Sequence, residues 1–123
     1  MIQQWIITAL ENNGFVFQAL LKGMDHNKIH WRPAEDKWNI LEIVCHLLDE
    51  EQFDFRARIK HVLENPLLPM PSINPTGWVQ EKNYASMNYE KTLQSFLMER
   101  TQSVNYLHTL HNVNWQTLHH HPK

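Results

Sequence analysis

The sequence predicts an all-α protein with the architecture of a helical bundle. Apolar residues recur at steps of three and four along three long segments, which is the period of an α-helix. Only 3 of the 123 residues are Gly, and stretches that contain Pro separate the segments. A chain of this length has the size of one domain. We therefore expect a single helical domain over residues 1–123 with three long helices.

The first helix is predicted from about Gln3 to Lys22. Its apolar residues fall on one helical face at the expected spacing, and they are Ile2, Ile6, Ala9, Leu10, Val16, Phe17, Leu20 and Met24. The following stretch, from Gly23 to Lys37, is polar and contains Pro33. We expect it to be a connection.

The second helix is predicted from Ile40 to Glu64. Asn39 is a favourable N-cap, and Glu42, three residues further on, completes the pattern of a capping box. Asn65 and Pro66 end the helix, because the residue before a proline disfavours helical backbone. Two apolar stripes along this helix indicate that it contacts more than one neighbour. They consist of Ile40, Ile43, Val44 and Leu47, and of Leu41, Cys45, Leu48, Phe55, Ile59 and Val62.

A long connection, from Asn65 to Asn83, contains four prolines and leads to the third helix. In an extended conformation it could reach about 60 Å, whereas a helix the length of the second one measures only about 38 Å. The connection can therefore cross the whole bundle, which predicts that the second and third helices run parallel. The third helix is expected to begin between Tyr84 and Tyr89 and to end near Leu110.

Composition excludes several classes of function. The chain has 11 Lys and Arg against 13 Asp and Glu, a net charge of −2, so it lacks the strongly basic surface that nucleic acid binding needs. No apolar run approaches the ~20 residues that span a bilayer. The single Cys excludes an intramolecular disulfide framework. We therefore expect a cytoplasmic protein with neither a nucleic acid nor a membrane as its partner.

His46 is the clearest candidate for chemistry. A neutral imidazole can bind a metal through one ring nitrogen. Asp49 and Glu50 follow at positions i+3 and i+4, on the same side of the helix. They could act as further ligands, as hydrogen-bond partners of the imidazole, or as a general base. The simpler alternative is a partly buried His that is hydrogen-bonded to a carboxylate.

Arg100 is unusual because it lies within the apolar seam of the third helix. It could anchor an anionic substrate, or it could pair with Asp49, Glu50 or Glu51 across the bundle. The structural ion pair is the simpler interpretation, because a charge on an apolar face is normally paired.

Three other groups have simple structural interpretations. His108 and His111, at the end of the third helix, and the run His119–His121 could bind a transition metal adventitiously. Histidines also suit the negative end of a helix. Cys45 is expected to be a small core residue.

The run Trp31-Arg32-Pro33, followed by residues 36–47, resembles the start of the second helix in DinB-like (DinB/YfiT) proteins. The likeness continues in residues 49–51, in Arg56 and Arg58, in Arg100 and Trp115, and in His121-Pro122. The resemblance implies a four-helix bundle with a long crossover between helices two and three, often assembled as a homodimer. It also implies a divalent metal, zinc or nickel, bound by three histidines, the first of which corresponds to His46.

The activities that this resemblance implies are metal-dependent hydrolysis or isomerisation and the transfer of low-molecular-weight thiols, with a small molecule as substrate. In such proteins His121-Pro122 would introduce the fourth helix, which carries the other two histidines. The sequence ends at Lys123, so we expect a domain truncated at its C-terminus, with the remaining ligands outside this chain or lost. The alternative is a non-catalytic helical module that acts through self-association or protein binding.

Overall fold

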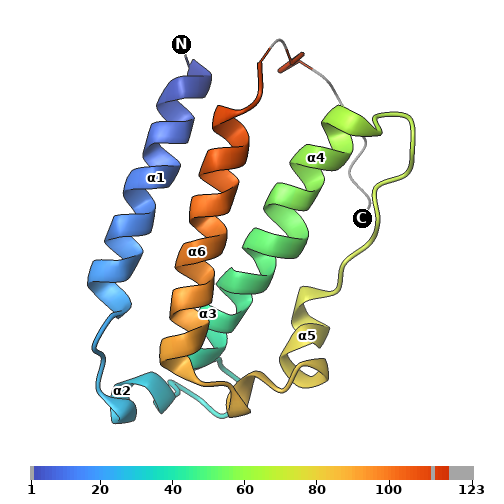
Figure 1. Ribbon diagram of the computed structural model, residues 1–123. Coiled ribbons are helices and arrows are strands. Elements are labelled where there is room, and N and C mark those ends of the chain that lie inside the picture. The colour runs from blue at the N-terminus through green and yellow to red at the C-terminus, as the bar shows by residue number, and fades with distance from the viewer. Residues whose placement is uncertain (1, 112, 117–123) are drawn as a thin grey trace.

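The computed structural model describes residues 2–111 and 113–116, and this part of the chain contains helices and no strands (Figure 1). The prediction of an all-α fold is confirmed. The elements in order are α1 (Ile2–Leu21), α2 (His26–His30), α3 (Ile40–Asp49), the π-helical turn η1 (Glu50–Phe55), α4 (Arg56–Glu64), α5 (Pro75–Glu81), the 3₁₀ turn η2 (Tyr84–Ser86) and α6 (Tyr89–His108).

The segments α3, η1 and α4 follow one another without a break and form one long helix over residues 40–64, called helix two below. In Figure 1, α6 lies between α1 and helix two, and it packs against both. Helix two and α6 run in the same direction, while α1 runs opposite to them. The parallel arrangement that the length of the crossover predicts is therefore confirmed.

Helix two begins as its sequence predicts. The Asn39 side chain accepts a hydrogen bond from the Glu42 amide at 2.9 Å, and the Glu42 carboxylate accepts one from the Asn39 amide at 3.1 Å. This reciprocal pair satisfies two donors that a helix start would otherwise leave unpaired. Arg32 adds an ion pair to the Glu42 carboxylate, which ties the preceding loop to the helix.

Both connections contain helices that the sequence analysis missed. The stretch expected to be a plain connection after α1 forms α2, where the Asp25 side chain caps the helix by accepting from the Asn27 amide. The proline-rich crossover is extended at first but then forms α5. There Asn74 is the N-cap and Pro75 occupies the first turn, where a missing amide proton costs nothing.

The main core lies where α6 meets α3 and the end of α1. Its most deeply buried side chains are Leu41, Val44, Tyr84 and Phe96. Phe96 meets Phe17 of α1 edge to face, with ring centroids 5.3 Å apart. Cys45 is also buried in this cluster, as the sequence predicts. A smaller cluster of Ile7, Val104 and Leu107 joins the other ends of α1 and α6.

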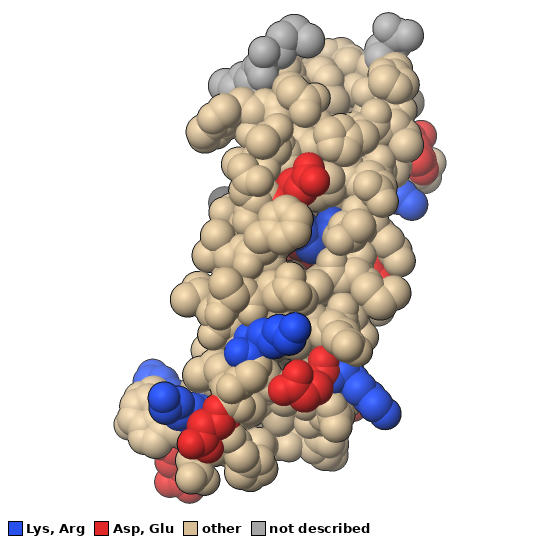
Figure 2. Space-filling view, turned by 60° about the vertical axis from the view of Figure 1, so that its left-hand side comes forward, with Lys and Arg blue, Asp and Glu red and all other residues tan. Residues whose placement is uncertain are grey.

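One side of α1 is not covered by any other described element. Trp5 and Leu20 are 71% and 67% exposed, and Val16 is also exposed. Figure 2 shows few Lys, Arg, Asp or Glu side chains over much of the neighbouring surface, and more of them toward the end that carries α2. None of the described helices is both long and apolar enough to cross a membrane.

Candidate functional site

The candidate site lies on helix two, at the point where the helix departs from regular geometry. The Arg56 amide donates to the Glu51 carbonyl, five residues back, rather than to a carbonyl four residues back as in an α-helix. The helix spans Ile40 to Glu64 as predicted, and its turn at residues 50–55 is π-helical. Such π turns occur mostly as single turns within α-helices and are frequent at functional sites.

His46 lies one turn before this irregularity, with its side chain 27% exposed. Its Nε2 is 3.6 Å from a carboxylate oxygen of Glu50, and its ring is 5.0 Å from the ring of Trp38. Its Nδ1 is buried, and within the described residues no group forms a hydrogen bond with it. Desolvation lowers the pKa of His46, although the charges of Asp49 and Asp54 oppose this shift. The imidazole is therefore neutral at pH 7, the form that can bind a metal.

Glu50 and Asp54 continue a row that starts at His46. Burial, together with the hydrogen bond and negative charge of Asp54, raises the pKa of Glu50 to about 7, and Arg58 partly opposes this. Arg58 forms an ion pair with Asp54, as the spacing of four residues predicts. The row therefore combines a neutral imidazole with a carboxyl group that exchanges its proton near neutral pH.

Asp49, the other predicted companion of His46, interacts with the crossover. Its carboxylate accepts a 2.5 Å hydrogen bond from the Tyr84 hydroxyl and lies 3.1 Å from the Lys82 ammonium. Burial and the Asp49 carboxylate raise the pKa of Tyr84, so the phenol keeps its proton and remains a donor. Asp49 thus fastens the segment after α5 to helix two.

Aromatic side chains lie near this site, and their contacts were not predicted from the sequence. Trp38 covers the His46 ring, and Trp78 of α5 lies 6.1 Å from Phe53 of helix two. The Lys82 ammonium lies 4.2 Å from the centroid of the Phe53 ring. The sequence does contain a signal for the helix that carries Trp78, because Asn74-Pro75 is a typical helix start.

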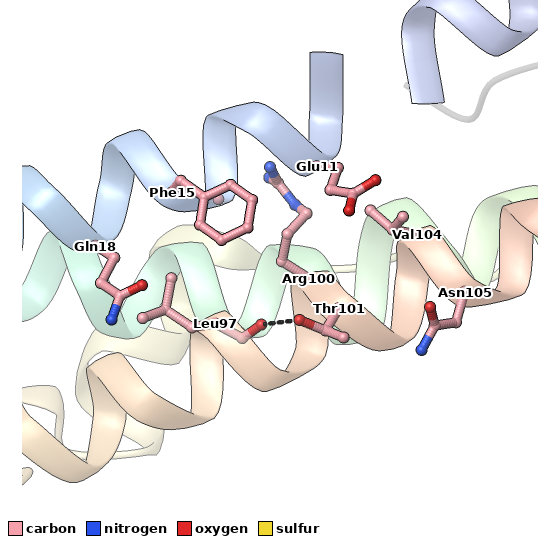
Figure 3. A pocket seen from close by; sticks show the side chains of 9 residues that line it. Glu11, Phe15, Gln18, Leu97, Arg100, Thr101, Val104 and Asn105 are labelled. Carbon is pink, nitrogen blue, oxygen red and sulfur yellow. Dashed lines mark hydrogen bonds between the residues drawn. The ribbon is translucent and has the colours of Figure 1, made fainter. Parts of the chain in front are cut away.

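Arg100 forms the structural ion pair that the sequence analysis favoured. Its Nε donates to Glu51 at 2.8 Å, and its Nη1 donates to the Leu10 carbonyl of α1 at 3.1 Å. Figure 3 shows Arg100 reaching from α6 toward α1, beside Phe15 and Glu11, at a pocket of about 230 Å³. Of the three acidic residues considered as partners, Glu51 is the one that pairs with it.

A comparison with protein families identifies the chain. The family model described as the DinB superfamily matches residues 9–123. The chain belongs to the DinB superfamily. No curated protein and no solved structure gave a significant match.

In this DinB-superfamily chain the other histidines do not converge on His46 within the described residues. His46 is near the start of helix two and His108 is at the end of α6, and the two helices are parallel, so these residues lie toward opposite ends of the bundle (Figure 1). The run His119–His121 and Pro122 lie outside the described residues. Over residues 2–111 and 113–116 no group of three His, Cys, Asp or Glu side chains could hold a metal ion.

Proposed function

We propose that this DinB-superfamily protein binds a divalent metal ion, zinc or nickel, and that His46 is one of its ligands. The observation that carries the proposal is the geometry around the imidazole. Its Nδ1 is buried without a hydrogen-bond partner among the described residues, and its Nε2 lies 3.6 Å from a carboxylate oxygen of Glu50. When Nδ1 carries the ring proton, the lone pair of the neutral imidazole is on Nε2. A metal ion bound at Nε2 would have the Glu50 carboxylate as a second donor.

The surroundings of His46 also favour a cation. Glu50, 3.6 Å from its Nε2, is crowded by the negative charge of Asp54. A divalent ion would relieve this crowding by taking the place of the proton on Glu50. The described residues offer His46 and Glu50 as donors, which is fewer than the three or four protein ligands of a stable zinc site. The remaining ligands would come from outside the described residues.

The reaction that we propose is metal-dependent hydrolysis or transfer of a low-molecular-weight thiol to a small molecule. A bound divalent ion would supply Lewis-acid activation of a water molecule or a thiol. Glu50 would be a ligand of this ion, because the ion replaces the proton that the carboxyl group exchanges at about pH 7 in the metal-free protein.

The proposal is tested by the metal content and the zinc and nickel affinities of the full chain, measured by elemental analysis and titration calorimetry. We expect His46→Ala to lose one ion per chain. His108→Ala is the matched control, because His108 is exposed and lies at the far end of α6, and it should bind as the wild type does. Equal binding by the wild type and His46→Ala would refute the proposal.

The run His119–His121 requires a separate variant in which all three residues are replaced by Ala. If these histidines bind metal independently of His46, each of the two variants will lose its own metal ion, and a variant that combines both changes will lose both ions. If they share an ion with His46, either change alone will remove it. Either result identifies which of the two groups holds the ion.

A second candidate function is self-association as a non-catalytic helical module. It is favoured by the exposed apolar side chains of α1, Trp5, Val16 and Leu20, because contiguous exposed apolar surface often marks an interaction site. A separate groove of about 320 Å³ lies between α1, helix two and α6, and its apolar lining includes Leu10, Phe55, Ile59 and Leu107.

Analytical ultracentrifugation tests the second candidate. We expect the wild type to form a dimer and Trp5→Glu with Leu20→Glu to be a monomer. Gln4→Glu adds a charge to an exposed position next to Trp5 but about 100° around the helix, and it should leave the dimer intact. A wild-type monomer at micromolar concentrations would exclude this function.

A further inference from the structure

Two residues of helix two, Glu51 and Arg56, both contact α6 although they are five positions apart. Glu51 accepts a hydrogen bond from Arg100 at 2.8 Å. Arg56 donates to the Glu99 carbonyl at 3.1 Å and to the Ser103 hydroxyl at 3.2 Å, and it also pairs with the Glu99 carboxylate. In a regular α-helix, residues five apart point about 140° away from each other. The π turn between them removes this conflict, because its backbone rotates less per residue.

The same turn keeps three side chains on one line along helix two. His46, Glu50 and Asp54 are spaced four residues apart, and in a regular α-helix Asp54 would lie about 80° around the helix from His46. In the structure the Glu50 carboxylate lies 3.6 Å from His46 Nε2, and Asp54 is close enough to raise the pKa of Glu50. The slower rotation of the π turn offsets the drift that would separate them.

Arg100 is the most rigidly held of the groups that fix this turn. Arg100 and Glu51 are only 7% and 3% exposed. The Arg100 guanidinium lies near the rings of both Phe17 and Phe96, 5.8 Å and 5.6 Å from their centroids. A second hydrogen bond, to the Leu10 carbonyl, links it to α1. A guanidinium held on several sides in this way fixes its carboxylate partner in both position and direction.

We propose that Arg100 is a positioning residue for the candidate metal site. By holding Glu51, it maintains the π turn that keeps Glu50 and Asp54 in line with His46. The effect on metal binding rests on the proposed function, whereas the positioning itself is a property of the metal-free protein. The position of the side chains and the affinity for metal can therefore be measured separately.

The first measurement is made without metal, on isotope-labelled full chain. Through-hydrogen-bond couplings in nuclear magnetic resonance report which carbonyl accepts from the Arg56 amide. In the wild type we expect a coupling to Glu51, the π bond. In the variant Arg100→Met/Glu51→Met we expect a coupling to Gln52, the bond of a regular α-helix, together with weaker contacts between the side chains of Glu50 and Asp54.

Arg100→Lys is an intermediate variant, because it keeps a cation beside Glu51 but loses the geometry of the guanidinium, and we expect a partial shift. Lys91→Met, at an exposed position of α6, is the control and should retain the π bond. If the double variant does not fold, the isosteric Glu51→Gln supplies the same measurement, with a partial shift toward the Gln52 carbonyl expected. An unchanged coupling between Arg56 and Glu51 in either folded variant would overturn the proposal and leave Arg100 with a purely structural role.

The second measurement is zinc affinity. Residues that orient a ligand typically change metal affinity by 10- to 100-fold when they are replaced, so we expect at least a tenfold weaker zinc affinity for the folded double variant and little change for Lys91→Met. Zinc affinity equal to that of the wild type would contradict the proposal. If the wild type binds no zinc, the proposed function fails, but the coupling experiment still decides whether Arg100 maintains the turn.

Discussion

The buried ion pair between Arg100 and Glu51 gives the sharpest prediction about stability. The side chains of the two residues are 9% and 4% exposed, so neither charge can be solvated if the other is removed. Arg100→Met leaves the Glu51 carboxylate buried and unpaired, and breaking a buried pair in this way typically costs about 3–5 kcal/mol. Because a domain of this size is usually stable by about 5–15 kcal/mol, this one substitution should remove a large fraction of the free energy of unfolding.

The second half of this prediction concerns the double variant Arg100→Met/Glu51→Met. It has no buried charge, and apolar replacements of similar volume are often neutral or even stabilising by about 1–4 kcal/mol. We therefore expect it to be more stable than Arg100→Met alone. Urea unfolding followed by circular dichroism gives the free energies by linear extrapolation. Lys37→Met is the control, because its ion pair with Asp36 is solvent-exposed and should contribute less than about 1 kcal/mol.

Two outcomes would refute this reasoning. A cost below about 1 kcal/mol for Arg100→Met would mean that water reaches Glu51. A double variant that is less stable than the single one would mean that the Glu51 carboxylate is not a buried unpaired charge in Arg100→Met, because another group or water has taken the place of Arg100.

Three further predictions follow. Burial raises the pKa of Cys45 to about 11, so a thiol reagent at pH 8 should label Cys45 only as fast as the protein opens, and labelling at the rate of a free thiol would contradict the structure. Phe96→Ala should cost about 3–5 kcal/mol in urea unfolding, whereas Phe15→Ala, on a side chain 65% exposed, should cost far less, and equal costs would contradict the assigned core. The pKa of Glu50 is raised from 4.5 to about 7, so the favourable contribution of its protonated form is complete below pH 4.5 and is lost as the pH rises through 7. As the pH rises from 4.5 to 7, Glu50→Gln should therefore gain stability relative to the metal-free wild type. If the urea midpoints of the two proteins differ by the same amount at every pH, the pKa of Glu50 is not raised.

The long helices were predictable because local signals mark their ends. Asn39 and Glu42 form the predicted capping box, and helix two ends at Glu64, directly before Asn65 and Pro66. The direction of α6 was also predictable, because the length of the crossover allowed it to return along the whole of helix two. In each case a few neighbouring residues, or a chain length, were sufficient.

The short helices and the surroundings of His46 were harder to predict. A helix as short as α2 has almost no periodicity, so Asp25, its cap, was the only available signal. Trp38 precedes helix two, while Trp78 lies on α5, and the approach of each to the candidate site depends on tertiary packing that periodicity does not report. The partner of Arg100 could be narrowed to three acidic residues but not to Glu51, because the choice depends on the rotation of helix two against α6.

The π turn was not predicted because a regular α-helix rotates by 100° per residue, and the apolar spacing of helix two gave no reason to expect a different rotation at residues 50–55. With the structure known, the sequence signal is the spacing of Glu51 and Arg56, two charged residues that both bind α6 although an α-helix would point them apart. The same irregular turn sets the position of Asp54 relative to His46. A substitution at Arg100 therefore acts on the candidate site through the backbone of helix two, without any direct contact between Arg100 and His46. For this reason the stability of the Arg100 variants and the geometry of the His46 row have to be measured on the same proteins.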